Sequence, residues 1–410
     1  TIKTPGGLTS SVTATRQATL SNPNDLLSLV TQTDTTTVNG KVFNTVYNAA
    51  QHRFTTTTPL NRSTVVTTDT QSRPLTLQLA GILPINYAYD TRGRLSSISQ
   101  GSGAAIHSLT YVYNAQGYVD SVTDALNRAT RYSYDATGRV QTITLPDTGV
   151  IGFGYDPNGN VTSVTPPGRP AHGFGYNAID QATDYTPPAL DIQPVATHYD
   201  YNLDGQPLKV TRPDGQTIDY DYDAGGRLAS LTMPTGVIGY GYKAGSGQLA
   251  SITAPGGIGL AYSYDGALPT GTTFTGPIAG SVSAAYDNFF RVSAVGVNGS
   301  AVALAYDADG LLTGAGGMTL ARDPGNGLVT GTTLGQIVTS QSYDGFGQPA
   351  GLTARQGATV LYDEQYVVRD NAGRVTQKTV TLGGQTSGYG YLYDPAGRLT
   401  DLTKDGTAIG

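Results

Sequence analysis

The sequence has no cysteine and no tryptophan among its 410 residues, and it has few charged side chains. Without cysteine, disulfides, thiolate nucleophiles and cysteine-based metal sites are excluded, and the chain can work in any redox compartment. Charged residues make up 13% of the chain, about half the usual fraction. Lys and Arg form no runs and the net charge is −6, so the clustered basic footprint that binds nucleic acid is missing. We therefore expect no nucleic-acid partner.

Long apolar runs are also missing. Stretches such as Ser300–Tyr306 are far shorter than the ~20 residues that a membrane-spanning helix needs. No charged n-region followed by an apolar h-region opens the chain. We expect no membrane span. The first residue is Thr1 rather than Met, which favours an excised or processed piece of a longer protein.

Catalytic and metal-binding motifs are not found. The four histidines lack metal-ligating spacing such as H-E-x-x-H, and no G-x-S-x-G elbow or P-loop occurs. The DADG stretch at Asp307–Gly310 is similar to the start of a Ca²⁺ loop, but the rest of that loop and its Glu are missing, so we interpret it as a hairpin turn. We predict no cofactor, no metal and no enzymatic activity. An enzyme would need a carboxylate pair converging in a pocket, which repeats cannot show from sequence.

What the chain does contain is one pattern repeated along its whole length. An aromatic residue before Asp or Asn recurs, and the commonest interval is 21 residues. A period in the twenties predicts a repeat architecture. The 17 aligned positions are Tyr47, Thr68, Tyr89, Tyr113, Tyr134, Tyr155, Tyr176, Tyr201, Tyr222, Tyr242, Tyr264, Tyr286, Tyr306, Arg322, Tyr343, Arg369 and Tyr393.

Each copy predicts two strands. Ile218, Tyr220 and Tyr222 alternate with polar residues, which is typical of a strand with one apolar face. No copy shows the 3.6-residue period of a helix. In the second strand Leu228 and Leu231 are three residues apart, and this spacing predicts either a β-bulge or a short strand.

The strands are joined by a D-x-x-G turn followed by Arg. We expect Asp to accept hydrogen bonds from backbone N–H groups two residues on, and Gly to adopt a positive φ. Phe290 and Asp180 replace the turn Gly in two copies, and we expect these copies to be decayed. The Pro-rich stretch at residues 185–194 predicts a loop or the omission of a strand. The best-preserved motif residues are Tyr89, Asp90, Gly93, Arg94, Tyr134, Asp135, Gly138, Arg139, Tyr155, Asp156, Gly159, Tyr222, Asp223, Gly226, Arg227, Tyr393, Asp394, Gly397 and Arg398.

The fold class that follows is an all-β array of antiparallel hairpins. Two strands from each of 17 copies give 34 strands, a ribbon of about 160 Å at about 4.8 Å per strand. Such a ribbon twists, and we expect it to curl once into a hollow shell or cocoon. Residues 1–80 are degenerate Thr-rich repeats, continuous with the repeat array at 81–410. The 27 tyrosines predict aromatic ladders on one face, either as packing or as a glycan-binding surface.

The copies YDYDAGGRL, YSYDATGRV and YLYDPAGRL carry a family resemblance. Y-x-Y-D-x-x-G-R-L resembles the YD repeat of the rearrangement-hotspot (RHS) family, over essentially the whole chain and most cleanly from Tyr87 to Thr403. The resemblance implies a hollow β-cocoon made by a spiralling ribbon. In relatives it encloses a toxic C-terminal domain, as in bacterial polymorphic toxins and insecticidal toxin complexes, and teneurins use a related shell in cell adhesion.

The function that this resemblance implies is a structural shell, in a secreted or cell-surface bacterial protein, that encloses, protects or delivers a C-terminal toxin or effector. Its partners would be that cargo domain or a secretion-system component. The alternative is an extracellular adhesion module or one that binds surface glycans. Relatives with cargo end in a self-cleaving D-P-x-G segment. Here D-P-x-G lies inside ordinary repeats, at Asp156–Gly159 and Asp394–Gly397, so we interpret both as turns and assign no protease residues.

Overall fold

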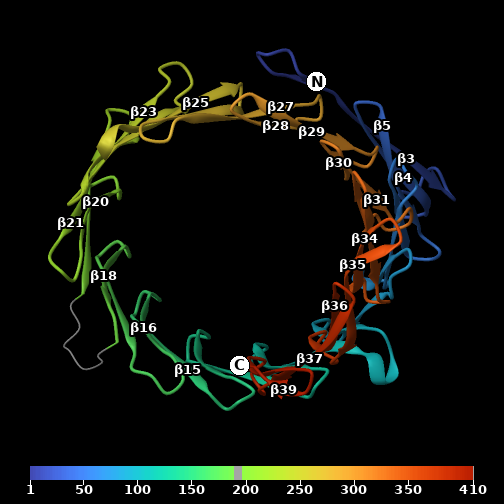
Figure 1. The fold of residues 1–410 in the computed structure, drawn as a ribbon. Helices are drawn as coiled ribbons and strands as arrows, with labels where there is room; N and C mark the ends of the chain where they lie inside the picture. Colours follow the sequence, from blue (N-terminus) through green and yellow to red (C-terminus); the bar gives the residue numbers. More distant parts are fainter. Residues whose placement is uncertain (189–195, 410) are drawn as a thin grey trace. The chain divides into compact units, whose positions relative to one another are not determined.

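The computed structural model describes residues 1–188 and 196–409 (Figure 1). Strands hold 60% of the residues. Within the described ranges the only helical elements are two short 3₁₀ turns, η1 (Gly103–Ala105) and η2 (Pro255–Gly257), and no helix is long and apolar enough to cross a membrane. The all-β prediction is confirmed. Most of the loop predicted at 185–194 lies outside the described residues.

The strands follow one another along the chain, and β3 to β39 form one long antiparallel sheet of 37 strands. Their bounds are β1 (Ile2–Lys3), β2 (Thr9–Ser10), β3 (Val12–Leu20), β4 (Leu29–Val38), β5 (Lys41–Asn48), β6 (Arg53–Thr57), β7 (Ser63–Thr68), β8 (Pro74–Leu79), β9 (Ile85–Tyr89), β10 (Leu95–Gln100), β11 (His107–Tyr113), β12 (Val119–Asp124), β13 (Ala129–Tyr134), β14 (Val140–Thr144), β15 (Val150–Tyr155), β16 (Val161–Thr165), β17 (His172–Tyr176), β18 (Ala182–Thr186), β19 (Thr197–Tyr201), β20 (Pro207–Thr211), β21 (Thr217–Tyr222), β22 (Leu228–Met233), β23 (Gly236–Tyr242), β24 (Leu249–Ala254), β25 (Ile258–Asp265), β26 (Leu268–Thr275), β27 (Gly280–Tyr286), β28 (Val292–Val297), β29 (Ser300–Tyr306), β30 (Leu312–Ala315), β31 (Met318–Arg322), β32 (Val329–Leu334), β33 (Ile337–Tyr343), β34 (Pro349–Gln356), β35 (Thr359–Arg369), β36 (Val375–Leu382), β37 (Gln385–Tyr393), β38 (Leu399–Lys404) and β39 (Thr407–Ala408).

The repeat accounts for the strand order. Each of the 17 aligned positions lies at or next to the end of a strand, and a second strand follows it, so the copies supply β5 to β38. These are the 34 strands that the repeat predicts. The strands β3, β4 and β39 flank them and complete the sheet.

A β-bulge lies beside the turn of nearly every copy. Tyr222 pairs with Leu228 while Asp221 pairs with Ser230, so Ala229 is an extra residue in β22. The same register shift occurs in the neighbouring hairpins of β15–β16, β19–β20 and β23–β24. The bulge brings Leu228 and Leu231 to one face of the sheet, which confirms the interpretation of their spacing.

Tyrosine and aliphatic residues alternate across the apolar face. Tyr220 pairs with Leu231, and Leu231 pairs with Ile238. A tyrosine therefore faces an aliphatic side chain here rather than another tyrosine, unlike a stacked aromatic ladder. Every tyrosine except Tyr118 is half-buried. None of the hydrophobic side chains in the described ranges is fully buried, because one face of a single sheet has little to pack against.

The decayed copies keep their turns. Gly226 has a φ of 73°, and Phe290 and Asp180 reach 60° and 62° without being glycine. The N–H of Phe290 donates to the carbonyl of Asp287 at 2.9 Å, as the N–H of Gly226 does to its own Asp. The expectation that these copies are decayed is wrong for the backbone, because the turn hydrogen bonds hold the left-handed conformation even where a side chain makes it costly.

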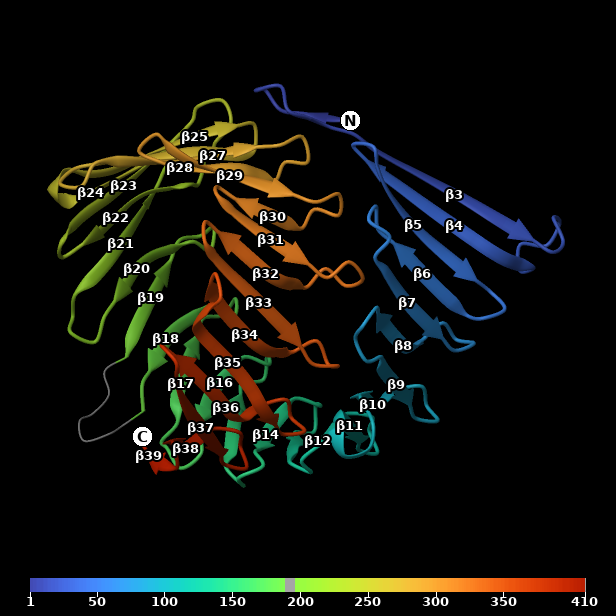
Figure 2. The same cartoon turned by 45° about the vertical axis from the view of Figure 1, so that its right-hand side comes forward.

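The chain divides into two compact units, residues 1–129 with 286–294 and 302–410, and residues 130–285 with 295–301. Within the first unit we call residues 1–129 the N-terminal segment, and residues 286–294 with 302–410 the C-terminal segment. Figure 2 shows the consecutive strands of both, β3 to β12 and β30 to β38. Hydrogen bonds join the two segments within the first unit, between residues far apart in the sequence, which the repeat did not predict.

Candidate functional site

The D-x-x-G-R turn is organised around the aspartate side chain. Asp223 Oδ1 accepts hydrogen bonds from the backbone N–H groups of Gly225 and Arg227, each at 2.9 Å. Asp223 Oδ2 accepts a hydrogen bond from Arg227 Nε at 2.8 Å. The carboxylate therefore closes the turn and fixes the direction of the arginine.

The arginine reaches the next copy. The Arg227 guanidinium carbon lies 4.5 Å from the centre of the Tyr242 ring. The Tyr242 hydroxyl donates to the carbonyl of Leu228 at 2.9 Å. Together, these groups form what we call the inter-repeat latch: the Asp and Arg of one turn, the Tyr that ends the first strand of the next copy, and the carbonyl that follows the Arg.

The latch recurs along the chain. Eight Asp–Arg ion pairs have the same four-residue spacing, with Asp at 69, 90, 124, 135, 223, 287, 370 and 394. An Arg lies over the ring of Tyr89, Tyr113, Tyr155, Tyr242, Tyr306 and Tyr393. The tyrosines whose hydroxyls donate to a carbonyl of the preceding copy are Tyr89, Tyr113, Tyr155, Tyr176, Tyr201, Tyr222, Tyr242, Tyr264, Tyr306, Tyr343 and Tyr393.

The predicted motif residues thus lie in successive turns and do not meet in one pocket. Gly93, Gly138, Gly159, Gly226 and Gly397 all have positive φ. Two predicted residues differ in detail from the pattern. Asp156 bonds the Asn160 amide at 2.9 Å because no Arg follows its turn, and the Arg398 side chain is 67% exposed although it pairs with Asp394.

Two arginines take the place of the latch tyrosine. Arg322 Nε donates to the carbonyl of Leu312 at 2.8 Å, and Arg369 Nη2 donates to the carbonyl of Pro349 at 2.7 Å. Both carbonyls occupy the position that a tyrosine hydroxyl reaches in other copies. Sequence reasoning aligned these arginines with the tyrosines but missed their role. The sequence does contain a signal for this role, because each of the two arginines occupies the position directly before the turn Asp, where other copies have tyrosine.

Glutamine takes the place of the latch arginine in several copies. Gln206 Nε2 donates to the carbonyl of Gly226 at 2.7 Å, and Gln181 Nε2 donates to the carbonyl of Gly205 at 3.0 Å. A neutral amide therefore also links one turn to the next.

The turn carboxylates are held in their charged form. The Arg227 side chain and its N–H lower the pKa of Asp223 below its ordinary value. The N–H of Arg94 does the same to the pKa of Asp90, and the Thr137 hydroxyl lowers the pKa of Asp135. A general acid needs a pKa near the working pH, so these carboxylates suit a structural role.

A second set of contacts joins the two segments, and we call it the seam. Arg62 Nη1 bonds Asp307 Oδ2 at 2.9 Å and Asp309 Oδ2 at 2.5 Å. Thr58 Oγ1 and the N–H of Leu60 also donate to Asp309, at 2.7 and 2.9 Å. The Asp309 side chain is only 5% exposed. The DADG stretch is thus a hairpin turn, as interpreted, and its carboxylates bind the N-terminal segment.

The seam continues on both sides of Arg62. Asn39 Nδ2 donates to the carbonyl of Asn288 at 2.8 Å, and Asn326 Nδ2 donates to the carbonyl of Ala80 at 3.1 Å. The residues joined by side-chain hydrogen bonds across the seam are 245 to 279 positions apart. D-x-x-G turns of the C-terminal segment therefore lie against turns of the N-terminal segment.

The histidines occupy separate environments. His198 Nδ1 lies 2.8 Å from Asp184 and its Nε2 lies 3.4 Å from Asp200. The hydrogen bond with Asp184 raises the pKa of His198. His172 Nδ1 lies 2.9 Å from the Tyr185 hydroxyl. In the part of the chain that the structure describes, no group of three or more His, Asp or Glu side chains is placed to hold a metal ion.

Comparison with known proteins identifies the repeat. The family model for the Teneurin YD-shell matches residues 2–409. No curated protein sequence matches the chain.

Several solved structures share the fold at low sequence identity. TcdB2–TccC3 without its hypervariable C-terminal region is 12% identical, covers 97% of this chain and has a TM-score of 0.57. The Tc holotoxin pore of Photorhabdus luminescens is 12% identical, covers 98% of this chain and has a TM-score of 0.55. TcdB2–TccC3–TEV is 13% identical, covers 97% and has a TM-score of 0.53. This chain spans only 26% of each of them.

Proposed function

Because the chain belongs to the Teneurin YD-shell family, we propose that it forms part of the wall of a shell that encloses, protects or delivers a C-terminal toxin or effector of the same protein. The protein would be secreted or displayed on a bacterial cell surface. The observation that carries this proposal is a sheet of 37 strands that is held together from copy to copy without a buried hydrophobic core in its described residues.

The way in which the sheet is built favours a role as the wall of a shell. A globular enzyme or binding domain buries its apolar side chains between layers. Here the latch stabilises each hairpin against the next, and the seam joins distant parts of the first unit. Stability in such an array is a sum of neighbour terms, so the sheet extends by adding copies.

A cargo is supported by the proteins with the same fold. The similar structures include a Tc holotoxin pore and TcdB2–TccC3 without its hypervariable C-terminal region. By analogy, this wall would belong to a longer protein with a variable toxic domain. The motif carboxylates are committed to turns, which supports a role without catalysis.

The adhesion and glycan-binding alternative has less support. Sugar binding by tyrosine would require exposed ring faces and free hydroxyls. The tyrosines other than Tyr118 are half-buried, and many of their hydroxyls donate to backbone carbonyls, as Tyr222 does to Pro207. This arrangement suits packing.

The test is limited proteolysis of the full-length protein, with and without residues 81–409. We expect the downstream domain to resist protease only when the repeats are present. Arg62→Ala, which breaks the seam, should shorten the time for which the downstream domain survives protease. Arg212→Ala, at an exposed ion pair, should leave that time unchanged. Equal digestion with and without the repeats would refute the shell function and leave the adhesion alternative.

A further inference from the structure

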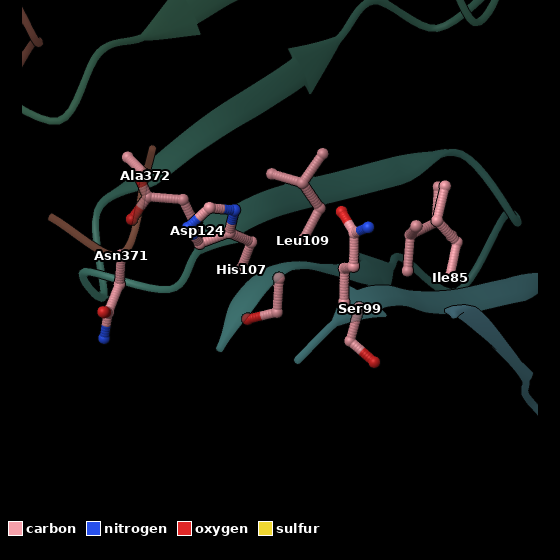
Figure 3. A pocket seen from close by; sticks show the side chains of 10 residues that line it. Ile85, Ser99, His107, Leu109, Asp124, Asn371 and Ala372 are labelled. Carbon is pink, nitrogen blue, oxygen red and sulfur yellow. The ribbon is translucent and has the colours of Figure 1, made fainter. Parts of the chain in front are cut away.

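A cavity of about 380 Å³ opens on the tyrosine-bearing face of β9 to β12. The aliphatic side chains of Ile85, Ile98 and Leu109 line it, and Figure 3 shows Ile85 and Leu109 beside it. Ile98 pairs with both Tyr87 and Leu109 on this face. One wall comes from the C-terminal segment, through the turn at residues 371–372. The cavity is therefore built by both segments at the seam.

Uncommitted polar groups lie at the edge of this cavity. The His107 ring stacks on Phe346 with centroids 3.8 Å apart. Neither the His107 nitrogens nor the Asn371 amide has a hydrogen-bond partner among the described residues. Gln100 Nε2 donates to the carbonyl of Leu83, which leaves its Oε1 available. Figure 3 shows His107, Asn371 and Leu109 around the same space.

The charge of the cavity is balanced. Asp124 is the one carboxylate in its lining, and it accepts hydrogen bonds from Arg128 Nε and Nη2 at 2.8 and 2.5 Å. A charged ligand would find no free counter-charge, and desolvating it would be costly. The cavity thus favours a neutral ligand with an apolar body and hydrogen-bonding groups beside it.

The volume of the cavity limits the size of the ligand that it can bind. A dry apolar cavity of about 150 Å³ holds benzene. This cavity is larger and open on one side, so it has room for an aromatic ring and the chain that carries it. Donors and acceptors at the edge match the amide groups that flank a side chain in a polypeptide.

We propose that this cavity binds an aromatic side chain on an extended, uncharged polypeptide segment. The ring lies on Ile98 and Leu109, and the flanking amides bond His107 and Asn371. An apolar pocket with a few convergent polar groups is the usual form of a binding site. The inference rests on the cavity alone and does not depend on the shell function.

The absence of tryptophan provides the assay, because a tryptophan peptide is the only source of indole fluorescence. The probe is acetyl-Gly-Trp-Gly-amide, followed by its emission maximum and anisotropy. We expect a saturable blue shift with the complete chain. Leu109→Arg should weaken binding about tenfold or more, and Asn371→Ala about twofold to tenfold.

Val112→Arg is the matched control. Val112 lies on the same strand, β11, but on the opposite face, and it is 48% exposed against 40% for Leu109. Circular dichroism and hydrogen exchange would confirm that both variants fold. Binding to Val112→Arg should be unchanged.

Three results would overturn the proposal. The first is no saturable shift, and the second is equal weakening by Leu109→Arg and Val112→Arg. The third is N-acetyltryptophanamide binding as tightly as the peptide, because the ligand would then be a free aromatic molecule rather than a polypeptide segment.

Discussion

The hydroxyl of Tyr222 donates a 2.8 Å hydrogen bond to the carbonyl of Pro207, 15 residues earlier in the chain. Tyr222 ends β21, and Pro207 begins β20. The bond therefore ties the last residue of one strand to the first residue of its neighbour, outside the regular backbone ladder. The same relationship recurs in most copies and makes tyrosine a linker between repeats.

Tyr222→Phe should destabilise the array locally. The substitution keeps the ring but removes the hydroxyl, which costs about 0.5–1.5 kcal/mol for one hydrogen bond. Urea unfolding and amide exchange in β20 and β21 would measure the loss. Tyr220→Phe is the control, since the Tyr220 hydroxyl has no partner among the described residues. Equal effects of the two substitutions would contradict the linker role.

Arg227→Lys should weaken the latch although it keeps the charge. Lysine lacks the planar guanidinium that bonds Asp223 and covers Tyr242. We expect a loss of about 0.5–1 kcal/mol, from the cation–π contact and the oriented hydrogen bond. Chemical denaturation would measure it. Arg212→Lys, at an ion pair where both side chains are nearly half exposed, should be close to neutral. If Arg227→Lys were also neutral, the guanidinium geometry would not matter.

Gly226→Val should strain the turn. A Cβ at Gly226 would lie 3.7 Å from its nearest neighbour, so the cost comes from the φ of 73° and not from a clash. We expect about 1–3 kcal/mol, confined to the hairpin of β21 and β22, because array stability is a sum of neighbour terms. Proteolysis at the turn would report it. The control is Gly225→Val, where φ is not positive. A variant as resistant as the wild type would disprove the turn assignment.

Arg62→Ala should open the seam. The substitution leaves Asp307 and Asp309 without their cation, and removing one partner of a buried ion pair costs about 3 kcal/mol or more. Exchange should rise at residues 58–62 and 307–310, while β21 to β24 in the other unit stay protected. Arg212→Ala should change stability by less than about 0.5 kcal/mol. Uniform loss of protection across both units would show that the seam is not a separate element.

The stability of the array should fall more steeply in acid than in mild alkali. The pKa of Asp90, Asp223 and Asp394 is lowered in the folded chain. Their contribution is complete above the unfolded pKa of about 3.9 and is lost as pH falls through the lower folded values. We expect constant melting temperatures between about pH 7 and pH 5 from these groups and a fall below about pH 4. A large loss between pH 7 and pH 5 would contradict this.

The contribution of His198 to stability changes with pH in the opposite direction. Its pKa is raised, so its ion pair with Asp184 is complete below the ordinary value of 6.5 and is lost as pH rises through the folded value. Since both side chains are exposed by 40% or more, this contribution is small.

Much of the local structure could be predicted because it depends on near neighbours. The alternation of Ile218, Tyr220 and Tyr222 gives a strand, and the spacing of Leu228 and Leu231 gives the bulge. The partner of Arg227 was not foreseen, although a tyrosine follows the latch arginine by 15 to 19 residues in each copy where the two are in contact. That contact spans two copies, and a motif read one copy at a time does not contain it.

The seam could not be predicted from the repeat. Arg62 and Asp307 are 245 residues apart, a separation that depends on how the sheet twists over many copies rather than on any single copy. The persistence of the turn at Phe290 was missed for a related reason. Its side chain disfavours a positive φ, and only the hydrogen bonds of the folded hairpin hold it there.

The order of the strands has a mechanical consequence. Since each hairpin pairs with its chain neighbours, tension applied at the two ends of the ribbon peels strands away one at a time and loads few hydrogen bonds at once. The contacts of the seam, such as the ion pair between Arg62 and Asp307, are the exception, because they join distant points of the chain. While that contact holds, the 245-residue loop between them carries no load. When it ruptures, the strands of that loop come under load and begin to peel one after another.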